Sequence, residues 1–374
     1  MFVHKLRSLV LGAPEDSDVL CRSLRASDVP VSTADCRACA DPCDLGHDAY
    51  PRRFNVDMAS NMLGSVDPYH RQLVISTGKA DWDRKIEDDK DSLAAALGQV
   101  IARPPPPPPV STSPPLSTSP KPSTSPKLPS SPPNPKGIRS GTGLFSSSDS
   151  TSTSVLNGSH RTVSEEEDDD TVLIFPDFKC VTEVSRSQQG ARDLWNTAVD
   201  PSIGREGVVL RRSPLKSWVL PYGCVILLCS HKKRDNRCGI AAPKLEHAFI
   251  KSLEAHGWDA DTHLEHPSLT MGPALEDLGS TPEEREETIA TQLQESTSSK
   301  RALIVKVSHI GGHRYAGNAI IYTPAGSGIW YGRVTPHDVD SIVTNTIVDG
   351  LILPPLLRGG VNLSRPNCKT LNDW

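Results

Sequence analysis

The run Gly223-Cys224-Val225-Ile226-Leu227-Leu228-Cys229 decides the fold of this chain. It has the length of a strand and no charged side chain, which predicts a strand buried on both faces. A helical pattern over Pro243–His256 follows, and Ala302–Val307 is a second buried run. Buried strands that alternate with helices are typical of an α/β layer, so we predict that class of fold.

The rest of the C-terminal half extends this layer. Pro282–Gln294 is predicted to be a charged helix, and Asn318–Thr323 and Ile329–Val334 an antiparallel pair of strands. Thr335-Pro336 is predicted to begin a helix to about Val348, because proline suits the first helical position. The order β-α-(α)-β-β-β-α predicts a mixed sheet with a thioredoxin-like outline.

A smaller α/β region is predicted before this layer. Arg71–Ser76 and Thr171–Pro176 have strand patterns, and Asp91–Ile101 has the pattern of a helix with Asp91 as its N-cap. A Pro/Ser-rich segment separates the helix from the second strand, so we interpret it as an insertion within the N-terminal region. The predicted divisions are an extension at 1–54, an α/β region at 55–102 and 171–215, a linker at 103–170, and a thioredoxin-like domain at 216–374.

The linker has a composition that does not support a packed core. Fifteen of the 33 prolines lie between Pro104 and Pro135, and Ser-Thr-Ser-Pro occurs at 111, 117 and 123. The segment closes with the acidic run Glu165–Asp170. We favour a disordered, solvated spacer. A kinase that acts on its Ser-Pro sites, or a proline-binding domain, would suit it as a partner.

The composition of the whole chain excludes several classes of function. Its 374 residues carry a formal net charge of −5 and its isoelectric point is about 6.2, so no basic field favours nucleic acid. No apolar run approaches the length of about 18 residues that a membrane-spanning helix needs. An odd number of cysteines, nine, and the lack of a signal-peptide pattern favour reduced thiols in an intracellular protein.

Two pairs of metal-binding residue types follow the two buried strands. Cys229 ends the first strand, and Cys238 follows in Cys229-Ser-His-Lys-Lys-Arg-Asp-Asn-Arg-Cys238. His309 and His313 follow the second strand, and the glycines between them permit a tight loop. Two thiolates and two imidazoles that converge from two strand ends would form a four-ligand site for a soft or borderline metal.

Spacing alone leaves the nature of this site open. Zinc and a [2Fe–2S] cluster are both compatible with it, and so is a surface loop with incidental cysteines and solvated histidines. A helix start beside Cys238 is expected to favour its thiolate. His231 is expected to be solvated rather than a further ligand. The basic side chains of the loop are expected to favour the same thiolate: Lys232, Lys233, Arg234 and Arg237.

Several segments resemble the sucrase/ferredoxin-like family, whose fungal members are named for actin patch distribution and for altered inheritance of mitochondria. The long segments are Cys229–Pro243, Ser308–Asn318 and Trp330–Pro336. Shorter ones lie upstream, and the resemblance covers most of the chain outside the linker. These upstream segments are His47–Pro51, Leu63–Val66 and Ser76–Trp82.

The resemblance implies a thioredoxin-like ferredoxin domain. It also implies a [2Fe–2S] cluster bound by Cys229, Cys238, His309 and His313. Two thiolates would make the oxidised centre neutral, whereas four would leave it negative, so its reduction potential should lie above that of an all-cysteine ferredoxin. Imidazole ligands can take up a proton on reduction, which would make the potential pH-dependent. The basic loop would help dock an acidic redox partner protein.

A second cysteine group lies before the first predicted strand. Cys36, Cys39, Cys43 and His47 have a spacing compatible with a metal site. A small zinc site or a relay of reactive thiols would use them. We favour a loop with free thiols, because the stretch is polar and belongs to no predicted element. The remaining cysteines are interpreted as structural or incidental: Cys21, Cys180, Cys224 and Cys368.

The two ends of the sequence favour different compartments. Asp373-Trp374 resembles the C-terminal signal that the cytosolic iron–sulfur targeting complex reads, which makes that complex an expected partner and the cytoplasm the expected location. The first residues, Met1–Leu11, resemble a weak mitochondrial presequence, so the mitochondrion is the alternative. Glu15 and Asp16 follow too soon for a convincing presequence.

A one-electron carrier or redox sensor is therefore the leading hypothesis. A thiol–disulfide protein that uses Cys229 and Cys238 is one alternative, although their spacing is far from Cys-x-x-Cys and it leaves the histidines unused. A zinc-stabilised adaptor that acts through the proline-rich tether is another. Hydrolase activity has no support, since no carboxylate pair or nucleophile elbow is present.

Overall fold

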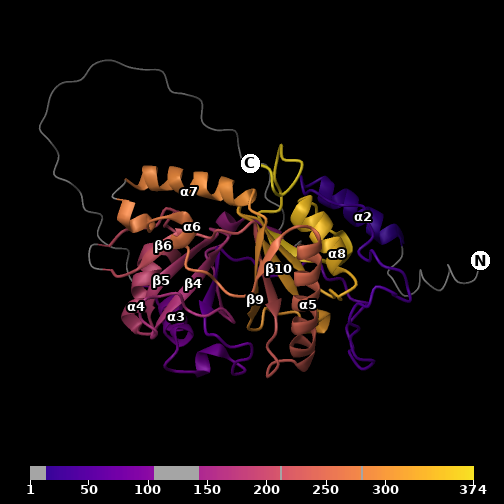
Figure 1. Ribbon diagram of the computed structural model, residues 1–374, viewed down its shortest axis with the longest axis horizontal. Coiled ribbons are helices and arrows are strands. Elements are labelled where there is room, and N and C mark those ends of the chain that lie inside the picture. The colour runs from indigo at the N-terminus through magenta and orange to yellow at the C-terminus, as the bar shows by residue number, and fades with distance from the viewer. Residues whose placement is uncertain (1–13, 105–142, 211–212, 279–280) are drawn as a thin grey trace, which may run out of the picture.

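The computed structural model describes residues 14–104, 143–210, 213–278 and 281–374, so the proline-rich part of the predicted linker lies outside the described residues (Figure 1). The helices of this part of the chain are α2 (Pro14–Arg25), α3 (Leu93–Ala102), α4 (Gln188–Leu194), α5 (Asn236–Ala255), α6 (Ser268–Met271), α7 (Pro282–Thr297) and α8 (Val339–Ile342). The strands are β1 (Arg71–Ser76), β2 (Leu144–Phe145), β3 (Thr153–Gly158), β4 (Asp169–Phe175), β5 (Lys179–Ser185), β6 (Lys216–Val219), β7 (Cys224–Cys229), β8 (Asp259–Asp261), β9 (Arg301–Val307), β10 (Ala319–Tyr322), β11 (Gly328–Tyr331) and β12 (Leu357–Val361).

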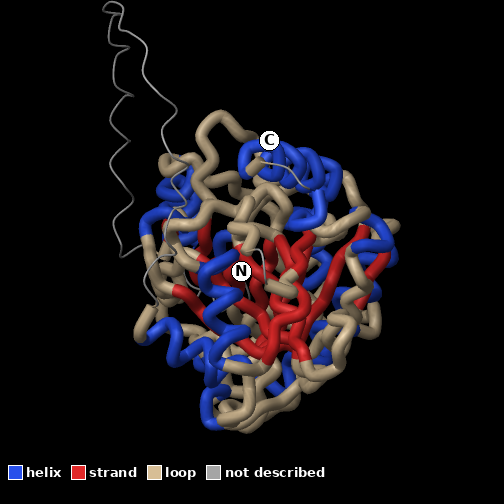
Figure 2. Tube along the Cα trace, turned by 90° about the vertical axis from the view of Figure 1, so that its left-hand side faces the viewer, coloured by secondary structure: helices blue, strands red, loops and turns tan. Residues whose placement is uncertain are grey.

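These strands form one mixed sheet that runs through the whole described structure. Its order is β2-β12-β11-β10-β7-β9-β3-β1-β4-β5-β6, and β8 also pairs with β9. Figure 2 shows the strands in the middle of the molecule with helices and loops around them. The prediction of an α/β class with a mixed sheet is therefore confirmed.

The C-terminal half has the predicted thioredoxin-like outline. Strand β7 pairs in parallel with β9, and the connection between them contains α5. Strand β10 then pairs antiparallel with β7, β11 pairs antiparallel with β10, and α8 follows. Because β7 is apolar on both faces, helices and loops cover it on both sides, and all six of its residues are buried.

The N-terminal half repeats this arrangement, which was not predicted. Strand β1 pairs in parallel with β3, β4 pairs antiparallel with β1, β5 pairs antiparallel with β4, and α4 follows. In both halves the last helix continues as a π-helical segment, Trp195–Val199 after α4 and Val343–Val348 after α8. The two halves lie side by side in Figure 1, with α3 and α4 in one and α5 and α8 in the other.

The halves join through their second strands, β3 and β9, in a pattern with two-fold character. Gly158 of β3 pairs antiparallel with Val307 of β9. The N–H of Ser159 donates to the carbonyl of Lys306 at 2.8 Å, and the Ser308 N–H donates to the carbonyl of Asn157 at the same distance. The hydroxyl oxygens of the same two serines act as acceptors in an equivalent way. The Ser308 hydroxyl accepts from the N–H of Asn157, and the Ser159 hydroxyl accepts from the N–H of Lys306, each at 3.0 Å.

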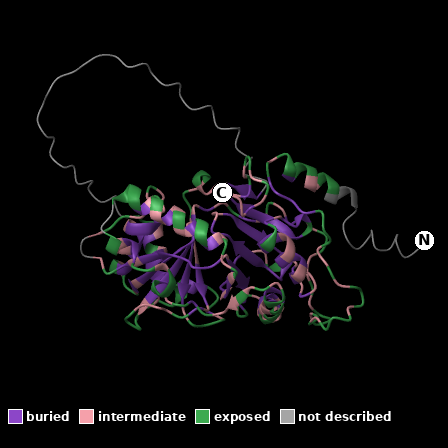
Figure 3. Ribbon diagram, turned by 45° about the horizontal axis from the view of Figure 1, so that its top comes forward, coloured by how far each residue is buried: buried purple, intermediate pink, exposed green. Residues whose placement is uncertain are grey.

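Three apolar clusters hold the helices to the sheet. In the C-terminal half α5 and α8 pack on one face through residues such as Phe249 and Ile342, and α7 packs on the other through Leu293. The third cluster lies between the N-terminal strands and helices α3 and α4. Figure 3 shows the buried strands at the centre and the exposed residues on the outer helix faces. Each fully buried side chain of this size stabilises the fold by roughly 1.5–3 kcal/mol.

Most predicted elements are present, with shifted ends. Helix α5 begins at Asn236 rather than at Pro243, because Asp235 caps it and the proline is accommodated within the helix. Helix α3 is capped by Ser92 rather than by Asp91. Folded structure also begins inside the segment predicted to be linker, with β2, β3 and the start of β4. The many serines and threonines of this part obscured a strand pattern that burial in the sheet supports. The domain boundaries remain a prediction.

Candidate functional site

The parallel pairing of β7 with β9 brings the two predicted pairs of site residues to one edge of the sheet. Cys229 ends β7 and is opposite Val307, the last residue of β9. Cys238 lies in the first turn of α5, and His309 and His313 lie in the loop that follows β9. The connections after both strands therefore start side by side.

The histidine loop has the backbone conformation that its two glycines were expected to permit. Gly311 and Gly312 both have positive φ, 77° and 63°. A Cβ atom at Gly312 would lie 2.3 Å from a guanidinium nitrogen of Arg358, so no other residue fits there without a shift. The loop places the rings of His309 and His313 with their centroids 5.5 Å apart.

The two thiols contact each other in a buried position. Cys229 is 2% exposed and Cys238 is 1% exposed. A hydrogen bond from Cys238 holds the pKa of the Cys229 thiol well below its usual value, and the side chain of His309 acts in the same direction. The same contact and burial raise the pKa of Cys238. These directions favour the thiolate of Cys229, and the effect of the helix start on Cys238 stays a prediction.

The imidazoles form the more accessible side of this group. Nδ1 of His309 is buried and has no hydrogen-bond partner among the described groups. Its ring is nevertheless close enough to Cys229 to affect that thiol. His313 is exposed. The group thus has a buried sulfur side, a half-buried His309 whose buried Nδ1 lacks a partner that a metal could supply, and an exposed His313.

His231 positions the histidine loop, although it was expected to be solvated. It is 1% exposed, and its Nε2 lies 3.0 Å from the carbonyl oxygen of Trp82. Its Nδ1 accepts a hydrogen bond from the backbone N–H of His309 at 3.2 Å. These two bonds fix the tautomer with the proton on Nε2 and tie the start of the histidine loop to the N-terminal half.

Arg358, on β12, is a buried cation beside the thiols that the sequence did not reveal. It is 1% exposed, and among the described residues no carboxylate lies within salt-bridge distance of it. Its guanidinium donates to Asn318 Oδ1 at 2.9 Å and to the side chain and carbonyl of Ser65 at 3.1 Å. Burial lowers the pKa of Arg358 to about 10, and the charge of Cys229 opposes that shift. A buried guanidinium without a carboxylate suits an anionic centre nearby.

Arg358→Lys is expected to lower the free energy of unfolding by roughly 3 kcal/mol. The guanidinium donates hydrogen bonds to Asn318, Ser65 and Gly311 at the same time, and a single ammonium group cannot make all of them. Urea unfolding followed by circular dichroism measures the change. Arg192→Lys, an exposed position on α4, is the matched control and should leave the unfolding free energy within about 0.5 kcal/mol of the wild type. Wild-type stability in Arg358→Lys would show that the buried fork is not required.

The N-terminal half lacks the same donor set at the equivalent positions. The register of β1 with β3 pairs Ser76 with Gly158, as that of β7 with β9 pairs Cys229 with Val307. Ser76 thus stands where the other half has Cys229, and His160 stands where it has His309. His160 is fully buried, and burial lowers its pKa to about 4, so it is neutral at pH 7. The repeat supplies one candidate centre rather than two.

The basic loop between the cysteines is partly neutralised by salt bridges. Lys233 forms a salt bridge with Asp83 at 2.9 Å, and Arg237 forms one with Asp235 at 2.7 Å. Lys232 and Arg234 are exposed. The positive charge that this loop presents to solvent is therefore smaller than the sequence suggested.

The structure also assembles part of the second cysteine group. Cys39, Cys43 and His47 lie together, and the fourth member of their group is His337 rather than the expected Cys36. Cys36 packs against the C-terminal core, and burial raises its pKa to about 12. The expectation that Cys36 belongs to this group is wrong, because its side chain turns inward while the three downstream residues turn toward His337.

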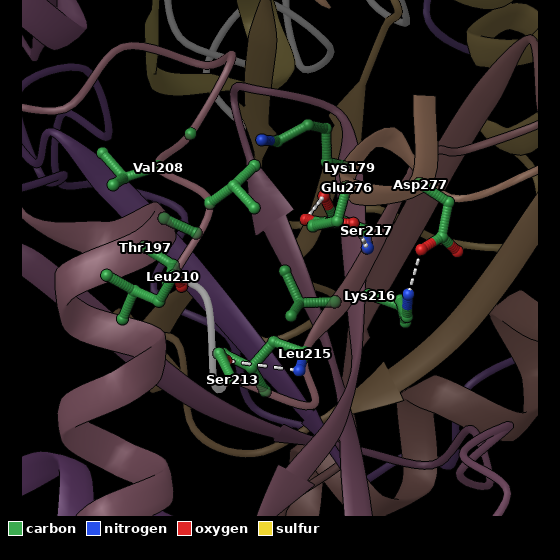
Figure 4. A pocket seen from close by; sticks show the side chains of 14 residues that line it. Lys179, Thr197, Val208, Leu210, Ser213, Leu215, Lys216, Ser217, Glu276 and Asp277 are labelled. Atoms are coloured by element: carbon green, nitrogen blue, oxygen red, sulfur yellow. Dashed lines mark hydrogen bonds and ion pairs between the residues drawn. The ribbon is translucent and has the colours of Figure 1, made fainter. Parts of the chain in front are cut away.

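A separate cavity of about 190 Å³ lies near β5 and β6 (Figure 4). Polar side chains that line the cavity are hydrogen-bonded to other groups of the protein. Lys179 donates to the carbonyl of Arg205, and Ser217 donates to Glu276 at 2.5 Å. None of the four predicted ligands lines it. We assign it no function.

No helix among the described residues has the length and apolarity that crossing a membrane would require. Near the C-terminus, Trp374 is 48% exposed and its indole N–H donates to Thr297 at 2.8 Å. Recognition of Asp373-Trp374 by a targeting complex, and the compartment, remain predictions.

The fold and the donor set define an α/β protein with a candidate Cys/His metal centre at the ends of two parallel strands. The family model described as sucrase/ferredoxin-like matches residues 62–359. The chain therefore belongs to the sucrase/ferredoxin-like family, as the sequence motifs predicted.

Curated relatives match a smaller part of the chain. Altered inheritance of mitochondria protein 32 of Debaryomyces hansenii is 36% identical over 140 residues, which cover 37% of this chain and 36% of that protein. Actin patches distal protein 1 of Saccharomyces cerevisiae is 31% identical over 183 residues, which cover 47% and 46%. The chain thus matches about a third to a half of the length of these relatives. No solved structure matches it.

Proposed function

We propose that this protein binds a [2Fe–2S] cluster through Cys229, Cys238, His309 and His313 and acts in one-electron transfer or redox sensing. The observation that carries the proposal is the parallel pairing of β7 with β9, which brings Cys229 and the loop of His309 and His313 from distant parts of the chain to one edge of the sheet. Two sulfur and two imidazole donors form a known type of ligand set for a two-iron cluster.

The surroundings of the four residues support a two-metal centre over a single ion. Among the described residues, these four do not form a group of three or more donors whose ligand atoms all lie within 4.8 Å of one another. A single tetrahedral zinc ion would need about that compactness. A two-iron cluster spans a larger distance than one ion, so it would suit a less compact set of two sulfur and two imidazole donors.

The residues around such a centre differ in charge and exposure between its thiol side and its imidazole side. When bound, the cluster would accept one electron. The buried guanidinium of Arg358 favours negative charge beside the thiolates, and the exposed position of His313 gives that imidazole access to protons and to a partner protein. Arg314, the next residue after His313, is exposed as well, which suits an acidic redox partner.

A thiol–disulfide function is the second candidate, favoured by the direct contact of Cys229 with Cys238. Both thiols are almost completely buried, however, so an external disulfide cannot reach either sulfur without opening the site. That function also leaves Arg358 and the unsatisfied Nδ1 of His309 without a role.

The visible spectrum of the anaerobically purified full chain tests the proposal. We expect a red-brown chromophore that dithionite bleaches, with two irons and two acid-labile sulfides per chain. A colourless protein with stoichiometric zinc in these ligands, or a colourless protein with a Cys229–Cys238 disulfide, would overturn it.

A further inference from the structure

The segment that carries Cys39, Cys43 and His47 has little backbone hydrogen bonding. Within residues 33–53, all of which the structure describes, no backbone N–H donates to a backbone carbonyl. Other contacts tie the segment to the protein. The N–H of Ser32 donates to Ile352 at 2.8 Å, and the Tyr50 hydroxyl donates to Val334 at 2.8 Å. Between them, the carbonyl of Asp35 accepts from Ser341 at 2.9 Å, and Asp48 forms a salt bridge with Lys244 at 3.6 Å. Something other than backbone pairing must define the loop between these anchors.

Four donor side chains meet in the middle of this loop. Cys39 Sγ lies 3.3 Å from Nδ1 of His337, and Cys43 Sγ lies 3.3 Å from Nδ1 of His47. The rings of His47 and His337 are edge-on with centroids 5.3 Å apart. One ligand atom from each of the four residues lies within 4.8 Å of every other, and all four residues are half-buried.

We propose that Cys39, Cys43, His47 and His337 bind one zinc ion. In a tetrahedral site with Zn–S bonds of about 2.3 Å and Zn–N bonds of about 2.0–2.1 Å, ligand atoms are about 3.3–3.8 Å apart. The two sulfur–nitrogen distances of 3.3 Å are at the short end of that range. Two independent Cys–His hydrogen bonds would explain these distances, but they would not explain why the two pairs approach each other around one point.

The backbone around the loop also suits a thiolate ligand. Partial burial acts to raise the pKa of the Cys43 thiol, but the N–H groups of Leu45 and His47 donate to its sulfur and lower the pKa below its usual value. Gly46, between these donors, has a φ of 70° that permits the tight turn. Backbone N–H donors to a ligating sulfur are typical second contacts of metal-bound cysteine.

A turn closed by hydrogen bonds between Thr335 and Asp338 positions His337. The carboxylate of Asp338 accepts hydrogen bonds from the N–H and the hydroxyl of Thr335, each at 2.7 Å. This turn keeps Thr335-Pro336-His337 outside the helix that the sequence predicted to begin there, and α8 begins only at Val339. The imidazole of His337 is therefore free of the helix and faces the cysteine loop.

A zinc ion at this site would fix the position of a loop whose downstream residues contact the main candidate site. Downstream of His47, the carbonyl of Asn55 accepts from Arg237 at 2.8 Å, and the N–H of Asp57 donates to the carbonyl of Arg314 at 2.9 Å. Arg237 and Arg314 are the direct sequence neighbours of Cys238 and His313. Zinc at the loop is proposed as a structural ion, and its binding does not depend on the cluster.

Metal analysis of the purified full chain and its variants tests this site. We expect one zinc ion per chain, and Cys43→Ser should lower the zinc content about tenfold or more while the visible spectrum, circular dichroism and iron content stay unchanged. Cys36→Ser is the matched control, three residues from Cys39, and should keep zinc. Cys229→Ser should keep zinc as well, so failure of the cluster proposal and failure of this one are distinguishable.

Cobalt substitution and the histidine variants cover the case in which Cys43→Ser does not fold. Co²⁺ added to the zinc-free chain should give the visible bands of a tetrahedral ion with two thiolates, and His337→Cys should keep them and strengthen the thiolate charge-transfer absorption. His337→Ala should weaken Co²⁺ binding by about 10–100-fold. No zinc and no tetrahedral cobalt spectrum in the wild type, or unchanged binding in His337→Ala, would overturn the proposal.

Discussion

Cys229→Ser is expected to remove the visible chromophore and to lower the iron and acid-labile sulfide content about tenfold or more, because the serine hydroxyl is a poor ligand for iron–sulfur centres. Cys229 is the residue that contacts both Cys238 and His309, so no other single substitution would disconnect as much of the group. Iron analysis, sulfide analysis and the visible spectrum of the anaerobically purified variant measure the effect.

The same strand offers a matched control. Cys224 begins β7 and is as buried as Cys229, but it belongs to the apolar cluster on the opposite face of the sheet. Cys224→Ser should cost stability, since it buries a hydroxyl in an apolar environment, and it should keep the chromophore. Loss of the chromophore in both variants would mean that folding, rather than ligation, is responsible. Its retention in Cys229→Ser would remove this residue from the ligand set.

His313→Cys is expected to keep the cluster and to lower its reduction potential by on the order of 100 mV, because a thiolate adds negative charge where a neutral imidazole stood. His313 is the exposed member of the group, so the substitution should disturb the fold less than one at His309. Protein-film voltammetry or a redox titration followed in the visible region measures the shift.

The pH dependence of the potential gives a second readout for the same variant. If imidazole takes up the proton on reduction, the potential of the wild type should fall as the pH rises, and that slope should shrink in His313→Cys. His247→Cys, at an exposed position on α5, is the control and should leave both the potential and its slope unchanged. An unchanged potential in His313→Cys would count against ligation by this residue.

Local patterns in the sequence predicted the elements that carry the main site. Strand β1 has the predicted bounds, and β7 and β9 each begin within one residue of the predicted start. Apolar runs of strand length identify buried strands well, because burial on both faces leaves no place for a charged side chain. The order of strands and helices then predicted the thioredoxin-like half and placed both Cys/His pairs after neighbouring strands.

Helix starts were less predictable, for a specific reason at each position. Pro243 was treated as the first turn of its helix, whereas Asp235 caps α5 and places Cys238 in the first turn. Thr335-Pro336 has the sequence of a helix start, but Asp338 binds Thr335 and delays the helix. In both cases the hydrogen bonds of one aspartate side chain determined where the helix begins, and a propensity does not reveal which residue forms them.

The sequence by itself determined the class of fold and the family, and it predicted the two pairs of residues of the candidate main site, because each depends on patterns within short stretches of neighbouring residues. Only the tertiary structure revealed that the first half repeats the topology of the second, that Arg358 lies buried beside the thiols, and that His337 rather than Cys36 joins Cys39 and Cys43. Such contacts join residues far apart along the chain. They depend on how the sheet brings strand ends and loops together, and no local spacing encodes that.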